Sequence, residues 1–249
     1  MRVNLEKIEK FYTTSVGQYA HNTVLPIIDN FLSGAGETQK TCIASAAAFP
    51  YMEQMKNMKR LSLQSFHDQD VWPESGKGHY ILADRTHWPY RAEEADFVVL
   101  IHDVEFAEDA DHYLREAWRV LKGEGRLVII IPNRSGKWAR YDNTPFGLGY
   151  PYTLEQMSKL LASAHFAIDR VAPALYHPPT LPESFVGEAY RSIIEKIGGY
   201  CLFQSGIYAI CASKHIYAPS SKGLGATAAQ KAKQALFPKP TAVNQRDPF

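Results

Sequence analysis

The first candidate for chemistry is an aspartate that follows a short predicted strand. Asp84 comes directly after residues 79–83, and an aromatic turn, Trp88-Pro89-Tyr90, follows it. The continuous, β-branched run over 96–102, DFVVLIH, predicts a parallel strand buried on both faces. Ligands of open α/β sheets lie beyond the carboxyl ends of the strands, so Asp84 is placed to accept a hydrogen bond from a ligand amino group. A solvated loop aspartate is the alternative.

The second candidate is a long loop over residues 132–153. The loop is too polar and too rich in glycine and proline for a helix or strand, and long loops that follow a strand usually carry function. Its aromatic side chains could wall an apolar pocket, with polar side chains orienting a ligand. The residues expected to line this pocket are Trp138, Phe146, Tyr150, Asn133 and Asp142. An ordered cap packed over the sheet explains the loop equally well.

Other kinds of chemistry find little support. The sequence contains no G-x-S-x-G, H-E-x-x-H, P-loop or G-x-G-x-x-G motif, which argues against a hydrolase or a dehydrogenase. The acidic stretch 102–112, HDVEFAEDADH, matches no metal-ligand spacing, so no metal site is expected and a solvated loop leading into a helix explains it better. His102 at the strand end could act as a base, but a structural hydrogen-bonding histidine is commoner and is preferred.

The elements that would position these residues alternate between strand and helix. Apolar runs predict seven strands, and segments with helical spacing of apolar residues lie between them. This order implies an α/β fold, a doubly wound, mostly parallel seven-stranded sheet with helices on both faces. The predicted strands, the first of them with its turn, cover residues 41–49, 60–66, 79–83, 96–102, 126–131, 166–171 and 206–213. The predicted helices cover residues 3–33, 51–58, 110–122, 153–164 and 184–196.

Composition limits the chain to one globular domain. Its 249 residues are 45% hydrophobic, enough for one domain with a sizeable core and too few for two full α/β domains. Residues 1–217 are expected to form this domain, and residues 218–249, rich in Ser, Gly, Ala, Lys and Pro, a flexible and mildly basic tail. The net charge of +1 demands neither a nucleic acid nor a membrane as partner. Without an apolar signal, a membrane-length run or a C-x-x-C pair, a cytoplasmic location is expected.

The run from residue 80 to residue 133 resembles class I S-adenosylmethionine (SAM)-dependent methyltransferases of the small-molecule, type 11 kind. The motifs that carry the resemblance, in the family's order and spacing, are Asp84, Trp88-Pro89-Tyr90, Asp96-Phe97, Arg119-Val120-Leu121-Lys122, Gly123, Gly125 and Arg126 to Ile131. The loop Asn-Arg-x-Gly-x-Trp-Ala…Asp-x-Thr-Pro-Phe-Gly resembles a bacterial subgroup of such proteins. The resemblance implies a Rossmann-like class I methyltransferase fold with SAM as cofactor.

The resemblance also assigns roles to single residues. Asp84, with Arg85 beside it, would bind the adenine amino group, and Ile101 and His102 would line the methionine part of the cofactor. Tyr12, on the N-terminal helix, would close over the cofactor, as N-terminal tyrosines do in related enzymes. An ordinary core or surface tyrosine explains Tyr12 at least as well.

The first half of the chain departs from the family pattern. The family has a carboxylate and a Gly-x-Gly-x-Gly turn near residues 42–50, where this chain offers Ala44, Ala46 and Ala48 to the cofactor. Alanine permits partial approach, but positive φ at an alanine costs about 1–2 kcal/mol, so a different path of the loop is expected. The acidic ribose anchor after the second strand is also missing, and Gln64 would offer only a neutral hydrogen bond.

Two functions are therefore consistent with the sequence. The first is a SAM-dependent methyltransferase acting on a small-molecule or unidentified acceptor, for which orientation of the acceptor suffices and no dedicated nucleophile is needed. The second is a methyltransferase-like protein that has lost catalysis and acts as a binding or scaffold partner. A small-molecule substrate, a partner protein and a homodimer are the expected associations.

Overall fold

The computed structural model describes residues 4–33, 40–55, 58, 60–65, 79–180 and 205–215. The predicted helix over 184–196, the predicted domain boundary at 217 and the predicted tail over 218–249 lie outside the described residues. Among the helices that the structure does describe, none is long and apolar enough to cross a membrane.

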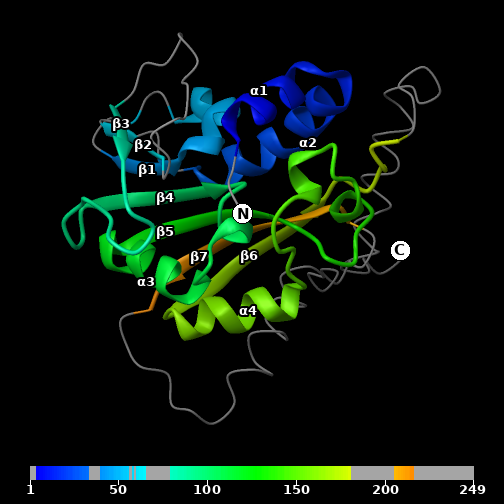
Figure 1. Cartoon of the computed structure of the whole chain (residues 1–249). Helices are drawn as coiled ribbons and strands as arrows, with labels where there is room; N and C mark the ends of the chain where they lie inside the picture. Colours follow the sequence, from blue (N-terminus) through cyan, green and yellow to red (C-terminus); the bar gives the residue numbers. More distant parts are fainter. Residues whose placement is uncertain are drawn as a thin grey trace, which may run out of the picture.

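The described residues contain a seven-stranded sheet in the order β3-β2-β1-β4-β5-β7-β6 (Figure 1). The strands from β3 to β5 pair in parallel, whereas β7 lies antiparallel between β5 and β6. The prediction of an α/β fold with a mostly parallel sheet is confirmed. The strands are β1 (Thr41–Ser45), β2 (Arg60–Ser65), β3 (His79–Leu82), β4 (Ala95–Ile101), β5 (Leu121–Pro132), β6 (Phe166–Ala174) and β7 (Ile207–Lys214).

Helices cover both faces of the sheet (Figure 1). One face packs against α1 (Leu5–Thr13) and α2 (Ser15–Phe31), and the other against α3 (Ala110–Val120) and α4 (Leu154–Ser163). Neighbouring residues of β4 serve different faces, because side chains alternate along a strand: Val99 packs with the first layer and Val98 with the second. Burial on both faces explains why β4 is continuously apolar from Phe97 to Ile101.

The N-terminal segment forms two helices, so the prediction of one helix over 3–33 is wrong. Thr14 separates them in an extended conformation, and its hydroxyl accepts a hydrogen bond from the Gly17 N–H (3.1 Å), which caps α2. The helices approach closely here, since a Cβ at Gly17 would lie 1.9 Å from the carbonyl oxygen of Phe11. Apolar periodicity continues across the break, so the sequence pattern alone does not reveal it.

A further difference follows β1. The strand ends at Ser45, and a 3-10 helix, η1 (Ala46–Gln54), takes the place of the predicted turn and of the start of the helix predicted over 51–58. The helix predicted over 110–122 ends at Val120, where β5 begins at once with Leu121. In both places apolar residues continue from one element into the next. The spacing of apolar residues therefore does not show where the first element ends.

The loop after β5 is anchored by residues next to β7 and β6. Asn133 donates its amide N–H to the carbonyl oxygen of Ser205 (2.8 Å) and accepts a hydrogen bond from the Ser135 N–H (3.0 Å). Trp138 is fully buried and donates its indole N–H to the carbonyl oxygen of His177 (2.7 Å). Asn133 and Trp138 thus anchor the loop through their polar groups, and their predicted pocket-lining role stays a prediction.

Gly206 packs so closely against Trp138 and the backbone of Leu175 that no side chain fits at this position. A Cβ there would lie 2.2 Å from Cδ1 of Trp138 and 2.8 Å from the carbonyl oxygen of Leu175. We expect Gly206→Ala to lower the free energy of unfolding by about 1–3 kcal/mol, because a buried ring and a backbone segment must both shift. Urea denaturation measures the change, with Lys137→Ala, an exposed position in the same loop, as the control. Unchanged stability of Gly206→Ala would contradict this packing.

Candidate active site

The parallel strands bring their carboxyl ends to one edge of the sheet. β1 ends at Ser45, β3 at Leu82 and β4 at Ile101, and the residues that follow each strand lie along this edge. In open α/β sheets this is the edge at which ligands bind. Predicted cofactor residues from distant parts of the sequence therefore meet here.

Asp84 lies exposed at this edge, two residues beyond β3. Its Oδ1 accepts hydrogen bonds from the backbone N–H (2.7 Å) and the hydroxyl (2.5 Å) of Thr86. These hydrogen bonds lower the pKa of Asp84 below its ordinary value, because they favour the charged form. The edge thus presents an ionised and accessible carboxylate.

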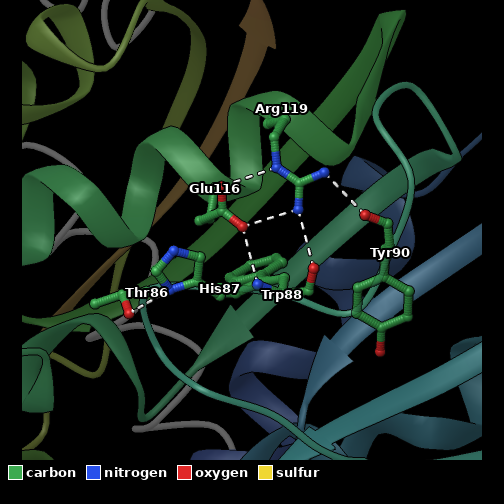
Figure 2. A network of polar contacts seen from close by, with 6 residues as sticks. All are labelled: Thr86, His87, Trp88, Tyr90, Glu116 and Arg119. Carbon is green, nitrogen blue, oxygen red and sulfur yellow. Dashed lines mark hydrogen bonds and ion pairs between the residues drawn. The ribbon is translucent and has the colours of Figure 1, made fainter.

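Figure 2 shows how the turn that follows Asp84 is fixed to α3. Arg119 donates to the carbonyl oxygens of Trp88 (3.0 Å) and Tyr90 (2.8 Å), and a second pair of its N–H groups donates to the Glu116 carboxylate. Glu116 also accepts a hydrogen bond from the Trp88 N–H (2.9 Å). The guanidinium is a rigid planar fork, so one side chain holds the turn at several points. The two motifs of the sequence, aromatic turn and helix end, thus position Asp84 together.

Arg85 has a partner other than the predicted one. Its guanidinium lies 3.0 Å from the Asp103 carboxylate and 5.7 Å from the centre of the Tyr113 ring. Asp103 is buried, and the Tyr113 hydroxyl donates to its second oxygen (2.5 Å). Burial raises the pKa of Asp103, while Arg85 and Tyr113 act in the opposite direction. Arg85 therefore ties the β3 turn to the residues that follow β4, and its predicted cofactor contact stays a prediction.

The three alanines lie where the family has its glycine turn, but they follow another path. Ala44 is in β1, and Ala46 and Ala48 are in η1; all three are buried. The residues with positive φ in the described part of the chain do not include them, as the cost at alanine leads one to expect. Ser45 joins this turn to β4, because its hydroxyl donates to the carbonyl oxygen of Ile101 (2.9 Å) and accepts from the Ile101 N–H (3.0 Å).

Four buried rings, those of Tyr12, Tyr51, His102 and Phe146, form an edge cluster beyond β1 and β4. The Tyr51 hydroxyl donates to Oη of Tyr12 (3.2 Å), and Oη of Tyr12 lies 3.0 Å from Nε2 of His102. The ring centres of Phe146 and His102 are 4.5 Å apart. The edge cluster thus unites three predicted residues with Tyr51, which no motif of the sequence marks.

Glu105 is the second residue that sequence reasoning missed. The stretch 102–112 was expected to be a solvated loop, but residues 102–107 are buried, so this prediction is wrong. One carboxylate oxygen of Glu105 accepts a hydrogen bond from the Asp103 N–H (3.1 Å). The other lies 3.7 Å from Nδ1 of His102, and neither of these two atoms has a hydrogen-bond partner among the described residues. The apolar residues on either side of Glu105 are the signal that could have revealed its burial.

A cavity of ≈ 660 Å³ lies between α1 and the loop after β5. Its wall includes Phe11, whose ring centre is 6.1 Å from that of Phe146 in the edge cluster. Asp142 lines the cavity as the sequence predicted for a pocket in this loop, whereas Tyr150 is exposed and is not one of its wall residues. Gln64 belongs to β2, but its side chain lies outside the described part of the structure.

Comparison with known proteins agrees with this geometry. The methyltransferase domain family matches residues 32–129, a range that includes β1, the Asp84 turn, β4 and α3. This stretch of the chain is similar to that family. The matched range is the part of the sheet whose strands end at the candidate site. No curated protein matches the chain.

Solved structures share the fold of this chain at low sequence identity. A SAM-dependent methyltransferase of Thermotoga maritima, described as a possible histamine N-methyltransferase, is 17% identical with a TM-score of 0.60, over 84% of this chain and 96% of that one. A putative methyltransferase of Haloferax volcanii, in complex with a methyltransferase activator, is 12% identical with a TM-score of 0.53, over 76% and 91%. A SAM-dependent methyltransferase of Archaeoglobus fulgidus is 15% identical with a TM-score of 0.54, over 76% and 94%.

Arg119→Lys tests whether the guanidinium fork holds the Asp84 turn. Lysine keeps the charge but cannot bridge two carbonyl oxygens and a carboxylate, so we expect the free energy of unfolding to fall by about 1–3 kcal/mol in urea denaturation. Arg115→Lys, which alters an exposed pair with Asp111 on the same helix, is the matched control and should change little. Equal losses in the two variants would show that charge alone matters.

Proposed function

We propose that the chain binds SAM along the carboxyl edge of β1 to β4 and transfers its methyl group to a small-molecule acceptor. The observation that carries the proposal is the exposed, ionised carboxylate of Asp84 on a fixed turn beyond β3. A carboxylate there can accept a hydrogen bond from the adenine amino group. SAM is the cofactor implied by the family, and the matched range contains this turn.

The residues along the edge fit the other parts of the cofactor. Ala46 and Ala48 are small. η1 begins at Ala46, and the side chain of its N-cap residue, Ser45, does not accept a hydrogen bond from the first N–H groups of η1. Ile101 and Tyr12 would contact the methionine part, and Gln64 the ribose, as expected from their places in the sequence. SAM supplies the reactive sulfonium methyl; the chain's own task is to orient the acceptor and exclude water.

The cavity beside α1 is the proposed place of the acceptor. Its volume of ≈ 660 Å³ lies within the range of about 300–1,000 Å³ that is usual for small-molecule sites. The rings of Phe11 and Phe146 lie between the cavity and His102, so an acceptor here would approach the end of β4 past apolar side chains. Asp142 would supply a polar contact that fixes the acceptor's orientation.

A non-catalytic role is the second candidate, and the edge cluster favours it. The buried rings of Tyr12, Tyr51 and His102 cover the end of β4, where the methionine part of SAM would lie. Gln64, at the position expected for the ribose anchor, would offer only a neutral hydrogen bond, which also weakens the site. In such a role the fold would bind a partner protein or a second copy of the chain, and the Haloferax protein with its activator is an example of a partner bound by a similar fold.

Calorimetric titration with S-adenosylhomocysteine separates the two candidates. If the chain is an enzyme, we expect a dissociation constant below about 100 µM, which corresponds to roughly −5.5 kcal/mol of binding free energy. Asp84→Ala should weaken binding at least tenfold, because it removes the charged partner of the adenine amino group. Asp169→Ala, an exposed aspartate of β6 that accepts from Ser213, is the matched control and should leave the affinity unchanged.

The outcomes have different meanings. Absence of heat at millimolar ligand with the wild-type protein would overturn the enzyme proposal and support the second candidate. Normal affinity of Asp84→Ala would leave the enzyme proposal standing but would show that the adenine lies elsewhere along the edge.

A further inference from the structure

A line of buried ionisable side chains crosses the carboxyl edge, from Tyr51 through Tyr12 and His102 to Glu105. We propose that Tyr12, His102 and Glu105 form a proton relay that removes a proton from the methyl acceptor, which therefore carries an ionisable O–H or N–H group. The relay rests on the proposed function. It also reverses the expectation that His102 is a merely structural histidine.

The hydrogen bonds give the relay a direction. Tyr51 donates to Oη of Tyr12, so the proton of Tyr12 itself is available for Nε2 of His102, 3.0 Å away. Burial raises the pKa of Tyr12 far above its ordinary value, so Tyr12 keeps this proton. A neutral imidazole that accepts at Nε2 carries its proton on Nδ1. The ring is thus held ready to accept a second proton at the nitrogen that faces Tyr12.

Glu105 is the positioning residue of the relay. Its free carboxylate oxygen lies 3.7 Å from Nδ1 of His102, and both side chains have 0% exposure. These two atoms lack hydrogen-bond partners among the described residues, although burial without a partner is costly for either group. A carboxylate here favours the proton on Nδ1 and stabilises the imidazolium that forms when Nε2 accepts. A separation slightly beyond hydrogen-bond length is common before a ligand binds.

The backbone at His102 supports a functional reading. His102 has φ of +51°, a left-handed conformation that few residues other than glycine adopt. Such strain is retained where the surroundings hold it, and it gathers at sites that do chemistry. Here it places the imidazole directly after β4, between Tyr12 of α1 and Glu105 of the following turn.

The other charged and ionisable groups around the relay have partners of their own. Asp103, which follows His102, is held by Arg85 and by the Tyr113 hydroxyl. His21 of α2 stacks on the Tyr51 ring and is hydrogen-bonded to the carbonyl oxygen of Pro50. Within the described part of the chain, the His102 ring is the group that lies beside the free carboxylate oxygen of Glu105.

In the proposed reaction, methyl transfer is coupled to two proton transfers. A lone pair of the acceptor's O or N forms the new bond to the methyl carbon, while the carbon–sulfur bond breaks and leaves its electron pair on sulfur. The acceptor's proton moves to Oη of Tyr12 as the proton of Tyr12 moves to Nε2 of His102. Tyr12 stays a neutral phenol throughout, and the imidazolium ends beside the Glu105 carboxylate. The proton then leaves to solvent when the products depart.

The first test uses the ligand-free protein and the ¹⁵N shifts of its histidine rings. We expect a neutral His102 with the proton on Nδ1 and an accepting Nε2, and Tyr12→Phe should move the Nε2 resonance because it removes the donor. The ring of His112, exposed on α3, is the internal control and should not respond. A neutral ring with its proton on Nε2 would overturn the relay.

The second test is kinetic, because a purely structural network would give the same tautomer. S-adenosylhomocysteine release from SAM is measured with a panel of phenols, alcohols and primary amines. Tyr12→Phe and His102→Asn, the latter tolerant of positive φ, should lower kcat about 10²–10⁴-fold at neutral pH, with the KM for SAM within about threefold. The loss should shrink as pH rises, because the acceptor then loses its proton unaided. Glu105→Gln should give a smaller loss of kcat.

Tyr19→Phe, a buried tyrosine of α2 outside the relay, is the control and should keep wild-type kcat. Wild-type kcat in Tyr12→Phe or His102→Asn would overturn the relay, as would a protein that binds S-adenosylhomocysteine but methylates no member of the panel. Failure of the wild-type protein to bind S-adenosylhomocysteine would instead overturn the proposed function itself.

Discussion

The carboxyl edge depends on the junction between β1 and β4. A single hydroxyl, that of Ser45, exchanges two hydrogen bonds with the backbone of Ile101 and so fixes where both strands end. The turn after β1 then starts as a 3-10 helix, and His102 is the first residue that leaves β4. In the edge cluster, His102 follows the end of β4, Tyr51 lies in η1 after β1, and Tyr12 lies on α1. Phe146, in the loop after β5, packs against His102.

Alanine in place of glycine changes what this edge can do. A glycine turn admits a cofactor because its backbone can adopt positive φ and can be approached closely. Ala46 and Ala48 instead bury their methyl groups in η1, and alanine loses less conformational freedom on folding than glycine, which is worth about 0.4–1 kcal/mol per position. Alanine therefore makes the turn stiffer than a glycine turn would be.

The sequence predicts those parts of the site that depend on local pattern. Asp84 follows a strand and precedes a turn, and β4 is apolar from Phe97 to Ile101, so both could be placed from neighbouring residues alone. The contact between Tyr12 and His102 joins residues 90 positions apart, and the burial of Glu105 depends on the same packing. Asn133 and Trp138 look like ligand contacts by composition, but their partners Ser205 and His177 decide otherwise. Contacts between residues so far apart in the sequence produce no local pattern from which they could be predicted.

The contacts of α1 with His102 and Phe146, which come much later in the sequence, have a consequence for the synthesis of the chain. Residues 5–13 leave the ribosome long before His102 and Phe146, against which Tyr12 and Phe11 pack. During that interval α1 can pack on α2, which follows it directly, but not on the end of β4. Tyr12 therefore meets Nε2 of His102 only after the chain as far as β4 has been made.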